Sequence, residues 1–245
     1  MRKIIVVIPA RYGSTRLPGK PLAELGDKPV IQHTYERAAR ARGLSDVIVA
    51  TDDQRIVQAV EGFGGRAVMT RADHRNGSER VAEVITAIDA DIVVNVQGDE
   101  PFIDPGMLDE AIAPLVADPA LVMSTLSRQI TEDELLHAPS VVKVVSDMNG
   151  NALYFSRSVI PYGRYPQLCR WQEHIGLYAY CRDFLLEFVR WPPTPLEQAE
   201  SLEQLRVLEH GYRIRVVETT RGQGVPGIDT PEDLARANRY LASLR

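Results

Sequence analysis

The sequence predicts an α/β fold whose sheet is mostly parallel and flanked by helices. Apolar, β-branched runs alternate with amphipathic stretches through the first half of the chain. Runs such as Ile92–Val96 (IVVNV) are almost continuously apolar, which is typical of strands covered on both faces. With 245 residues, 44% of them hydrophobic, the chain can bury a sizeable core. Regular β–α alternation favours parallel pairing of the strands.

Hydrophobic periodicity predicts the elements of the first half in order. Strands are expected at residues 3–8, 46–50, 66–69 and 91–96. Amphipathic helices are expected between them, at residues 30–41, 54–62 and 79–88. A further helix is expected over residues 105–117, with a proline at its start.

The second half is less regular. Strands, some of them antiparallel, are expected at residues 141–145, 152–155, 175–181 and 213–218. Segment 156–172 carries prolines, aromatic residues and arginines without periodicity, so it is expected to leave the sheet. Helices are expected at residues 196–210 and at the C-terminus, where Thr230 is the predicted N-cap before Pro231. Since no repeat, low-complexity tract or linker is visible, residues 1–245 are predicted to form a single domain.

Composition excludes several classes of protein. The net charge is −5, so the molecule as a whole does not attract nucleic acid. Cys169 and Cys181 have neither the number nor the spacing of a disulfide framework or a zinc site, and we expect reduced thiols. The first apolar run is too short for a signal peptide or a membrane span. A cytoplasmic protein is expected.

The segment after the first strand has the character of a phosphate-binding loop. Three cations, Arg11, Arg16 and Lys20, surround two glycines directly beyond that strand. In open α/β sheets ligands bind beyond the carboxyl ends of strands. Glycine exposes backbone N–H groups to an anion, and arginine or lysine adds charge-assisted contacts. The alternative is an ordinary solvated loop.

Spacing excludes two familiar nucleotide-binding motifs. A P-loop has four residues between its glycines and Ser or Thr after the lysine. Here five residues separate Gly13 from Gly19, and Pro21 follows Lys20. No G-x-G-x-x-G follows the strand either, which disfavours a dinucleotide-dependent dehydrogenase. A different nucleotide cradle remains.

Acidic residues follow three later segments. Asp99 comes after a glycine just beyond the fourth strand, and Asp229 lies in a turn shaped by glycine and proline. Together they could hold one or two Mg²⁺ ions on a triphosphate, although solvated turn aspartates explain them equally well. Asp52 and Asp53 follow the second strand. One of them could cap the next helix, or they could contact a ligand.

With these residues in view, the chain resembles the 3-deoxy-manno-octulosonate (Kdo) cytidylyltransferases, also called CMP-Kdo synthetases. The resemblance runs nearly from end to end. Its blocks include IPARYGSTRLPGKPL (8–22), VATDD (49–53), RADHRNGSERVAE (71–83), VNVQGDEP (94–101), VVKVV (141–145), ALYFSRSVIP (152–161), HIGLYAY (174–180), LEQLRVLEHG (202–211) and GIDTPEDL (227–234). Any one block is weak evidence, but all of them in this order are specific.

The resemblance implies a Rossmann-like nucleotidyltransferase fold and a reaction. CTP and Kdo give CMP-Kdo and pyrophosphate, which activates Kdo for lipopolysaccharide synthesis. The anomeric hydroxyl attacks the α-phosphorus in line, so the protein must align the reactants and neutralise phosphate charge. A homodimer built partly from segment 156–172 is also implied.

The resemblance further assigns roles to individual residues. Arg11 and Lys20 would contact the triphosphate, and Asp99 and Asp229 would hold Mg²⁺. The other nucleotide-binding candidates are Ala10, Gly13, Arg16 and, within segment 75–80, Asn76, Gly77 and Arg80. The sugar-acid candidates are Gln97, Arg157, His174, Tyr178, Glu203 and Gln204, with Arg157 expected to meet the Kdo carboxylate.

Several of these residues have competing interpretations. His174 could be a packed histidine, although Tyr178 four residues later shares its face in a strand. Glu203 and Gln204 could lie on a solvated helix face. Arg16 could contact phosphate or a neighbouring acid, and Lys143 is interpreted as structural or as a rim residue.

One departure from the family pattern is visible, and two rival functions stay open. Residues 76–78 read Asn-Gly-Ser where the family usually has Ser-Gly-Thr, so the side chain that reads the base is undecided. A sister enzyme acting on an 8-amino Kdo analogue or a sialic-acid-like sugar is one rival. A catalytically silent nucleotide-binding homologue is the other.

Overall fold

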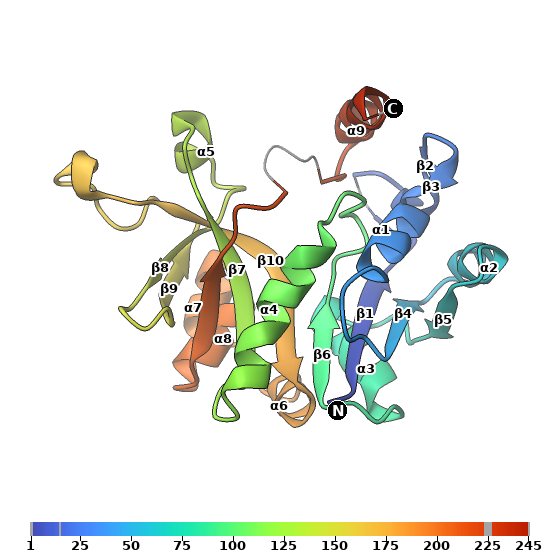
Figure 1. Cartoon of the computed structure of the whole chain (residues 1–245), viewed down its shortest axis with the longest axis horizontal. Helices are drawn as coiled ribbons and strands as arrows, with labels where there is room; N and C mark the ends of the chain where they lie inside the picture. The colour runs from blue at the N-terminus through green and yellow to red at the C-terminus, as the bar shows by residue number, and fades with distance from the viewer. Residues whose placement is uncertain (1, 15, 223–226, 245) are drawn as a thin grey trace. The chain divides into compact units, whose positions relative to one another are not determined.

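The computed structural model describes residues 2–14, 16–222 and 227–244. Two compact units make up the chain (Figure 1): residues 1–109 with 221–245, and residues 110–220. We describe each unit by itself, and the single domain expected for residues 1–245 stays a prediction. None of the helices in the described ranges has both the length and the apolar character of a membrane span.

The first unit contains a parallel sheet. Its strands lie in the order β6 (Ile92–Asn95), β1 (Ile4–Ala10), β4 (Asp46–Thr51) and β5 (Arg66–Met69). All three pairings between these strands are parallel. A short hairpin, β2 (Glu24–Leu25) with β3 (Lys28–Pro29), follows the 3-10 turn η1 (Lys20–Leu22). The helices are α1 (Val30–Ala38), α2 (Gln54–Gly62), α3 (Gly77–Thr86), α9 (Pro231–Ser243) and the start of α4 (Pro105–Ala117).

Strand β1 forms the centre of this sheet. Val6, Val7 and Ile8 are completely buried, as expected for a strand covered on both faces. Ala10 pairs with Thr51 at the end of β4, and Val7 pairs with Asn95 at the end of β6. The segments that follow these three strands therefore leave the sheet at one edge, where ligands bind in open α/β folds.

The second unit has mixed pairing. Strand β7 (Met123–Gln129) lies between β11 (Ile214–Glu218), to which it is parallel, and β10 (Gln172–Cys181), to which it is antiparallel. Strand β8 (Lys143–Ser146) pairs antiparallel with both β10 and β9 (Ala152–Ser156). The helices are α5 (Asp133–His137), α6 (Arg182–Phe188), α7 (Pro195–Glu200), α8 (Gln204–Glu209) and the remainder of α4.

Most of the predicted elements are confirmed, one expected helix is wrong, and several elements, among them α5 and α6, were not predicted. The predicted helix over residues 196–210 is wrong, because α7 ends at Ser201 in the left-handed region (φ 52°) and α8 starts at Gln204. Strand β7 was not predicted. Segment 156–172 does leave the sheet: residues 157–171 contain only the 3-10 turn η2 (Pro166–Leu168) and extend away from β8 and β9 as the gold segment of Figure 1.

Candidate active site

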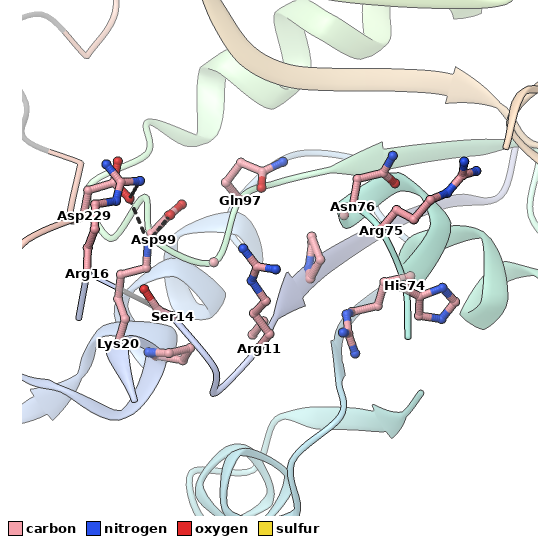
Figure 2. A pocket seen from close by; sticks show the side chains of 16 residues that line it. Arg11, Ser14, Arg16, Lys20, His74, Arg75, Asn76, Gln97, Asp99 and Asp229 are labelled. Atoms are coloured by element: carbon pink, nitrogen blue, oxygen red, sulfur yellow. Dashed lines mark hydrogen bonds and ion pairs between the residues drawn. The ribbon is translucent and has the colours of Figure 1, made fainter. Parts of the chain in front are cut away.

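A cavity of about 390 Å³ opens at the carboxyl ends of β1 and β6, entirely within the first unit. Figure 2 shows it as an elongated site, with the Lys20 side chain near one end and the Asn76 side chain near the other. Its walls are formed by Pro9, Ala10, Arg11, Ser14, Arg16, Lys20, Pro21, His74, Arg75, Asn76, Gly77, Arg80, Gln97, Gly98, Asp99 and Asp229. Most of the residues predicted to bind nucleotide or metal are therefore brought together. Gly13 is not among the lining residues.

The loop between Arg11 and Lys20 is organised around Tyr12. The Tyr12 carbonyl accepts hydrogen bonds from the backbone N–H groups of Ser14 and Gly19. Gly19 has φ +70°, and a Cβ there would lie 3.1 Å from the Tyr12 ring, so glycine suits both the conformation and the space. The guanidinium of Arg55 stacks 3.4 Å from the centre of the same ring. These contacts hold the loop and direct Lys20 into the cavity.

Lys20 bridges the two acids that the sequence singled out. Its Nζ lies 2.5 Å from Asp99 and 3.0 Å from Asp229. Arg16 adds a second cation 3.0 Å from Asp229 (Figure 2), so of the two alternatives left open for Arg16 the structure shows the contact with an acid. Burial alone would lower the pKa of Lys20, but the two carboxylates outweigh it and raise that pKa. The ammonium therefore stays charged in the cavity.

Two distant segments position these carboxylates. Gly98 brings the end of β6 against β1, since a Cβ at residue 98 would lie 2.9 Å from the Pro9 carbonyl oxygen. The backbone N–H of Ile228 donates to the Asp99 carbonyl at 3.1 Å, which ties the two acidic segments together. Asp229 directly precedes Thr230, which is the N-cap of α9 as the sequence predicts and which also forms a capping box with Asp233.

The two carboxylates fit a Mg²⁺ site that a polyphosphate completes. Both contact one nitrogen atom, so their oxygens lie close enough to share a small cation. Within the described ranges no group of three or more His, Cys, Asp or Glu side chains could hold a metal. Mg²⁺ is commonly held by one or two carboxylates, with phosphate oxygens and water as its other ligands. The residues present suit a metal that arrives with a nucleotide.

At the other end of the cavity Asn76 begins helix α3. Its side-chain oxygen accepts from the backbone N–H of Glu79 at 2.9 Å, and Asn76 is therefore an N-cap. Ser78 is 1% exposed and its hydroxyl lies 3.5 Å from the Asn95 amide. Residues 76–78 (Asn-Gly-Ser) therefore retain a capping residue and an inward hydroxyl although they differ from Ser-Gly-Thr.

Arg80, which lines the same end of the cavity, is held in a fixed orientation. Its guanidinium donates to Thr70 at 2.5 Å and to Asp52 at 2.9 Å. Asp53 accepts from the backbone of Arg55 as the N-cap of α2. The two neighbouring aspartates therefore have different tasks: one orients an arginine and the other starts a helix.

Sequence reasoning overlooked some residues of this wall. His74 lies in the lining with a side chain that is only 3% exposed, and its Nε2 hydrogen-bonds to Glu83. Ser14 also contributes to the lining. Only their positions in the family-like blocks 8–22 and 71–83 could have pointed to Ser14 and His74, because neither residue shows a distinctive spacing of its own.

Of the sugar-acid candidates, Gln97 lines this cavity and the others belong to the second unit. There the His174 and Tyr178 rings lie 5.4 Å apart, which confirms that they share a face. The Tyr178 hydroxyl lies 3.4 Å from the Gln204 side-chain oxygen. Gln204 is only 2% exposed, so the solvated-face interpretation is wrong for it. Burial lowers the pKa of His174 to about 3, which keeps the ring neutral.

Backbone carbonyls are the main partners of Arg157, a remaining candidate of the second unit, and of Lys143. The Arg157 guanidinium donates to the backbone carbonyls of Glu200, Pro139 and Ser201. Lys143 is completely buried, and its Nζ donates to two backbone carbonyls, which supports the structural interpretation. Glu203 precedes α8 as its N-cap residue and is partly buried.

Comparison with known proteins identifies the family. The cytidylyltransferase family model matches residues 5–214. The 3-deoxy-manno-octulosonate cytidylyltransferase of Geobacter metallireducens is 56% identical over 98% of both chains. The enzyme of the same name from Geobacter sulfurreducens is 54% identical over 97% of this chain and 99% of its own.

A solved structure agrees with these relatives. The structure of CMP:2-keto-3-deoxy-manno-octonic acid synthetase complexed with CTP superposes with a TM-score of 0.95 at 48% identity, covering 99% of this chain and all of that one. This match confirms the predicted mixed, mostly parallel α/β fold. The chain belongs to the cytidylyltransferase family and, within it, to the 3-deoxy-manno-octulosonate cytidylyltransferases.

Proposed function

We propose that the cavity of the first unit binds CTP with Mg²⁺ and that the chain transfers CMP to the anomeric hydroxyl of Kdo. The observation that carries this proposal is the arrangement at one end of the cavity. Lys20 lies between Asp99 and Asp229, and Arg16 pairs with the second of these acids. Cations and paired carboxylates in one cavity are what a metal-bound triphosphate requires.

The proposed reaction is an in-line displacement. The anomeric oxygen forms a bond to the α-phosphorus, and the bond from that phosphorus to the bridging oxygen of the pyrophosphate group breaks. Pyrophosphate leaves with the bonding electron pair, and the hydroxyl proton passes to solvent. Because no covalent intermediate with the protein is needed, the contribution of the chain is alignment and charge stabilisation.

The cations have separate places in this step. Arg11 and Lys20 line the cavity and would donate to the phosphate oxygens on which negative charge develops. Asp99 and Asp229 would hold Mg²⁺, which supplies charge neutralisation and lowers the pKa of a bound hydroxyl. Arg80, oriented by Asp52, would face the nucleoside.

At the nucleoside end the backbone of Ala10 and Gly77 would approach the cytidine, together with Asn76. Gly13 keeps its predicted role of contacting the nucleotide through its backbone as part of this proposal, although it does not line the cavity. The Asn76 oxygen already caps α3, so its amide N–H groups are the part of that side chain left to meet the base.

The second unit would contribute the sugar-acid site. Neutral His174, Tyr178 and Gln204 form a compact polar group there. Glu203 and Arg157 complete the proposed set of this unit, and Gln97 stays a separate sugar-acid candidate in the cavity of the first unit. Arg157 uses three of its five N–H donors on backbone carbonyls, and the remaining ones would meet the Kdo carboxylate.

We place this reaction in lipopolysaccharide synthesis, because Kdo is a component of that envelope polymer, and in the cytoplasm, where CTP is made. We also propose a homodimer formed partly through the segment between β9 and β10. Tyr162, Tyr165 and Leu168 of this segment are 88%, 56% and 77% exposed, an amount of apolar surface that a second copy would cover.

Labelled CTP tests the reaction directly. With Kdo and Mg²⁺, label at the α-phosphorus is expected in a sugar nucleotide and label at the γ-phosphorus in pyrophosphate. Label at the α-phosphorus that appears only in free CMP would show hydrolysis and contradict transfer. CTP binding with no release of either label would indicate the silent homologue.

A further inference from the structure

Strand β10 contains an irregularity next to His174. On β7, Leu126 pairs with Ile175, but its neighbour Thr125 pairs with Tyr178, so β10 has two extra residues at this point. A bulge of this kind leaves backbone groups without ladder partners and re-aims the side chains beside it. The side chain of Thr125, which is completely buried, fills the position.

The Thr125 hydroxyl meets three polar atoms at once. Its Oγ1 lies 2.9 Å from the Leu177 carbonyl oxygen, 3.1 Å from the Ile175 carbonyl oxygen and 2.9 Å from His174 Nε2. A hydroxyl has one hydrogen to donate and lone pairs that accept. Both carbonyls can only accept, so the hydroxyl must direct its single hydrogen toward them, to one carbonyl or shared between the two. Its remaining contact is then a bond that it accepts from His174.

The alternative assignment is electrostatically unfavourable. If the hydroxyl donated to His174 Nε2, its lone pairs would face two carbonyl oxygens at 2.9 and 3.1 Å with no hydrogen between them. The carbonyls would also lose the hydrogen that they otherwise receive or share, and a buried group left without a partner costs about 1–3 kcal/mol. The hydrogen-bond geometry therefore selects a proton on Nε2.

We propose that Thr125 is a positioning residue that fixes His174 as the neutral Nε2–H tautomer, so that Nδ1 accepts a hydrogen bond from a hydroxyl of the bound sugar acid. This inference rests on the proposed function for the identity of the ligand, but the tautomer itself does not depend on it. A bare Nδ1 repels a carboxylate and binds a hydroxyl, so His174 reads the polyol part of the acceptor.

The aromatic surroundings of His174 keep the ring in place. Phe155 meets it edge-on, with ring centres 4.9 Å apart, and Tyr178 lies on the same face of the strand. Among the residues that the structure describes, none is a hydrogen-bond partner of the amide nitrogen of buried Gln204. An acceptor on His174 and a donor on Gln204 are complementary to a hydroxyl group, which both donates and accepts.

Nitrogen NMR of histidine-labelled protein tests the tautomer. In the wild-type chain the Nε2 of His174 is expected to resonate as a protonated, pyrrole-type nitrogen and Nδ1 as a pyridine-type nitrogen. Thr125→Val, which removes the hydroxyl at nearly constant shape, should shift the His174 signals toward a mixture of tautomers. Thr125→Ser should restore the wild-type pattern. A protonated Nδ1 in the wild-type chain would overturn the proposal.

Kinetics of the same variants tests the role in binding. Thr125→Val is expected to raise the KM for Kdo by about five- to tenfold, the effect of one neutral hydrogen bond, with the KM for CTP unchanged. Ser124→Ala is the matched control, because its buried hydroxyl donates to the Ala111 carbonyl and makes no contact with His174. An unchanged KM for Kdo beside a confirmed tautomer would refute the sugar contact. Failure of the wild-type chain to use Kdo would instead refute the proposed function, with the NMR result unaffected.

Discussion

Lys20 is a positive charge placed where a metal ion is expected. Its ammonium offsets the repulsion between Asp99 and Asp229, so the two carboxylates can stay together before any ligand binds. The side chain of Lys20 is 13% exposed, so water screens these ion pairs less than it would at the surface. In the proposed site Lys20 would therefore compete with a cation that binds alone and would assist one that arrives with a polyphosphate.

Lys20→Met tests this competition. Removing the ammonium leaves two facing carboxylates, so Mn²⁺ is expected to bind the nucleotide-free variant several-fold more tightly than the wild-type chain, while turnover falls. Electron paramagnetic resonance of free Mn²⁺ measures the binding. Lys28→Met is the matched control, since Lys28 pairs with Glu36 outside the cavity. Weaker Mn²⁺ binding to Lys20→Met would contradict the account.

Asp99→Asn removes one of the two charges expected to hold the metal. The amide preserves the shape of the side chain, so the fold should persist while Mg²⁺-dependent turnover falls by about a hundredfold or more. Asp109→Asn, which alters an acid outside the cavity, should leave the rate unchanged. Pyrophosphate release and circular dichroism together check this. Near-normal activity in Asp99→Asn would remove this residue from the metal site.

Burial of His174 leads us to expect that the free energy of unfolding depends on pH. Burial lowers its pKa to about 3, whereas the unfolded chain has an ordinary histidine pKa near 6.5. Between these values the unfolded state binds one more proton, so acidification lowers the free energy of unfolding, by at most about 1.4 kcal/mol per pH unit. Above about pH 6.5 the ring is neutral in both states, so its protonation no longer lowers the free energy of unfolding.

Urea unfolding of His174→Gln across this pH range checks the sign. The variant should lose stability with acid less steeply than the wild-type chain. His137→Gln, at a histidine whose side chain is 65% exposed, should follow the wild-type curve. Parallel curves for the wild-type chain and His174→Gln would show that this ring is not held neutral.

At the scale of elements, helix α3 joins the fold to the site through its N-cap. Asn76→Ala should lower the free energy of unfolding by about 1 kcal/mol, because the N–H of Glu79 loses its acceptor. Asn76→Ser keeps a capping oxygen and should retain most of both stability and turnover. Chemical denaturation and pyrophosphate release measure the two properties. A Ser variant as unstable as the Ala variant would rule out the capping role.

The elements also show what periodicity predicts and what it misses. Strands such as β1 and helices such as α2 follow from uninterrupted apolar or amphipathic patterns. Strand β7 was missed because Ser124, Thr125 and Ser127 interrupt its apolar pattern, yet all three are buried. The hydroxyls of the first two find internal hydrogen-bond partners, and burial then costs little. Such partners come from distant segments and leave no local signal.

The candidate site likewise has parts that the sequence predicts and parts that it misses. The sequence brings Lys20 and Asp99 to one cavity because both follow strands that end at one edge of a parallel sheet. The ion pair from Lys20 to Asp229 joins residues 209 positions apart, and the residue pattern suggested a shared triphosphate site but no direct contact between them. The Thr125–His174 contact depends on an irregularity in strand pairing, which periodicity does not reveal.

For the whole molecule, the segment between β9 and β10 predicts the oligomeric state. The wild-type chain should have twice the 27.3 kDa mass of one copy in light scattering. The double variant Tyr162→Ser/Leu168→Asp removes two exposed apolar side chains and should shift the protein toward a single copy. Met148→Asp alters a fully exposed apolar residue outside this segment and should not. A wild-type mass of one copy would contradict the proposed dimer.

As a whole molecule, the chain transfers CMP from CTP to one sugar acid and releases pyrophosphate. The most direct measurement is pyrophosphate release from CTP and Mg²⁺ with Kdo, with its 8-amino analogue, with N-acetylneuraminate and without acceptor. The account predicts rapid release with Kdo and little with the other three. Preference for another acceptor, or release that does not depend on one, would contradict it.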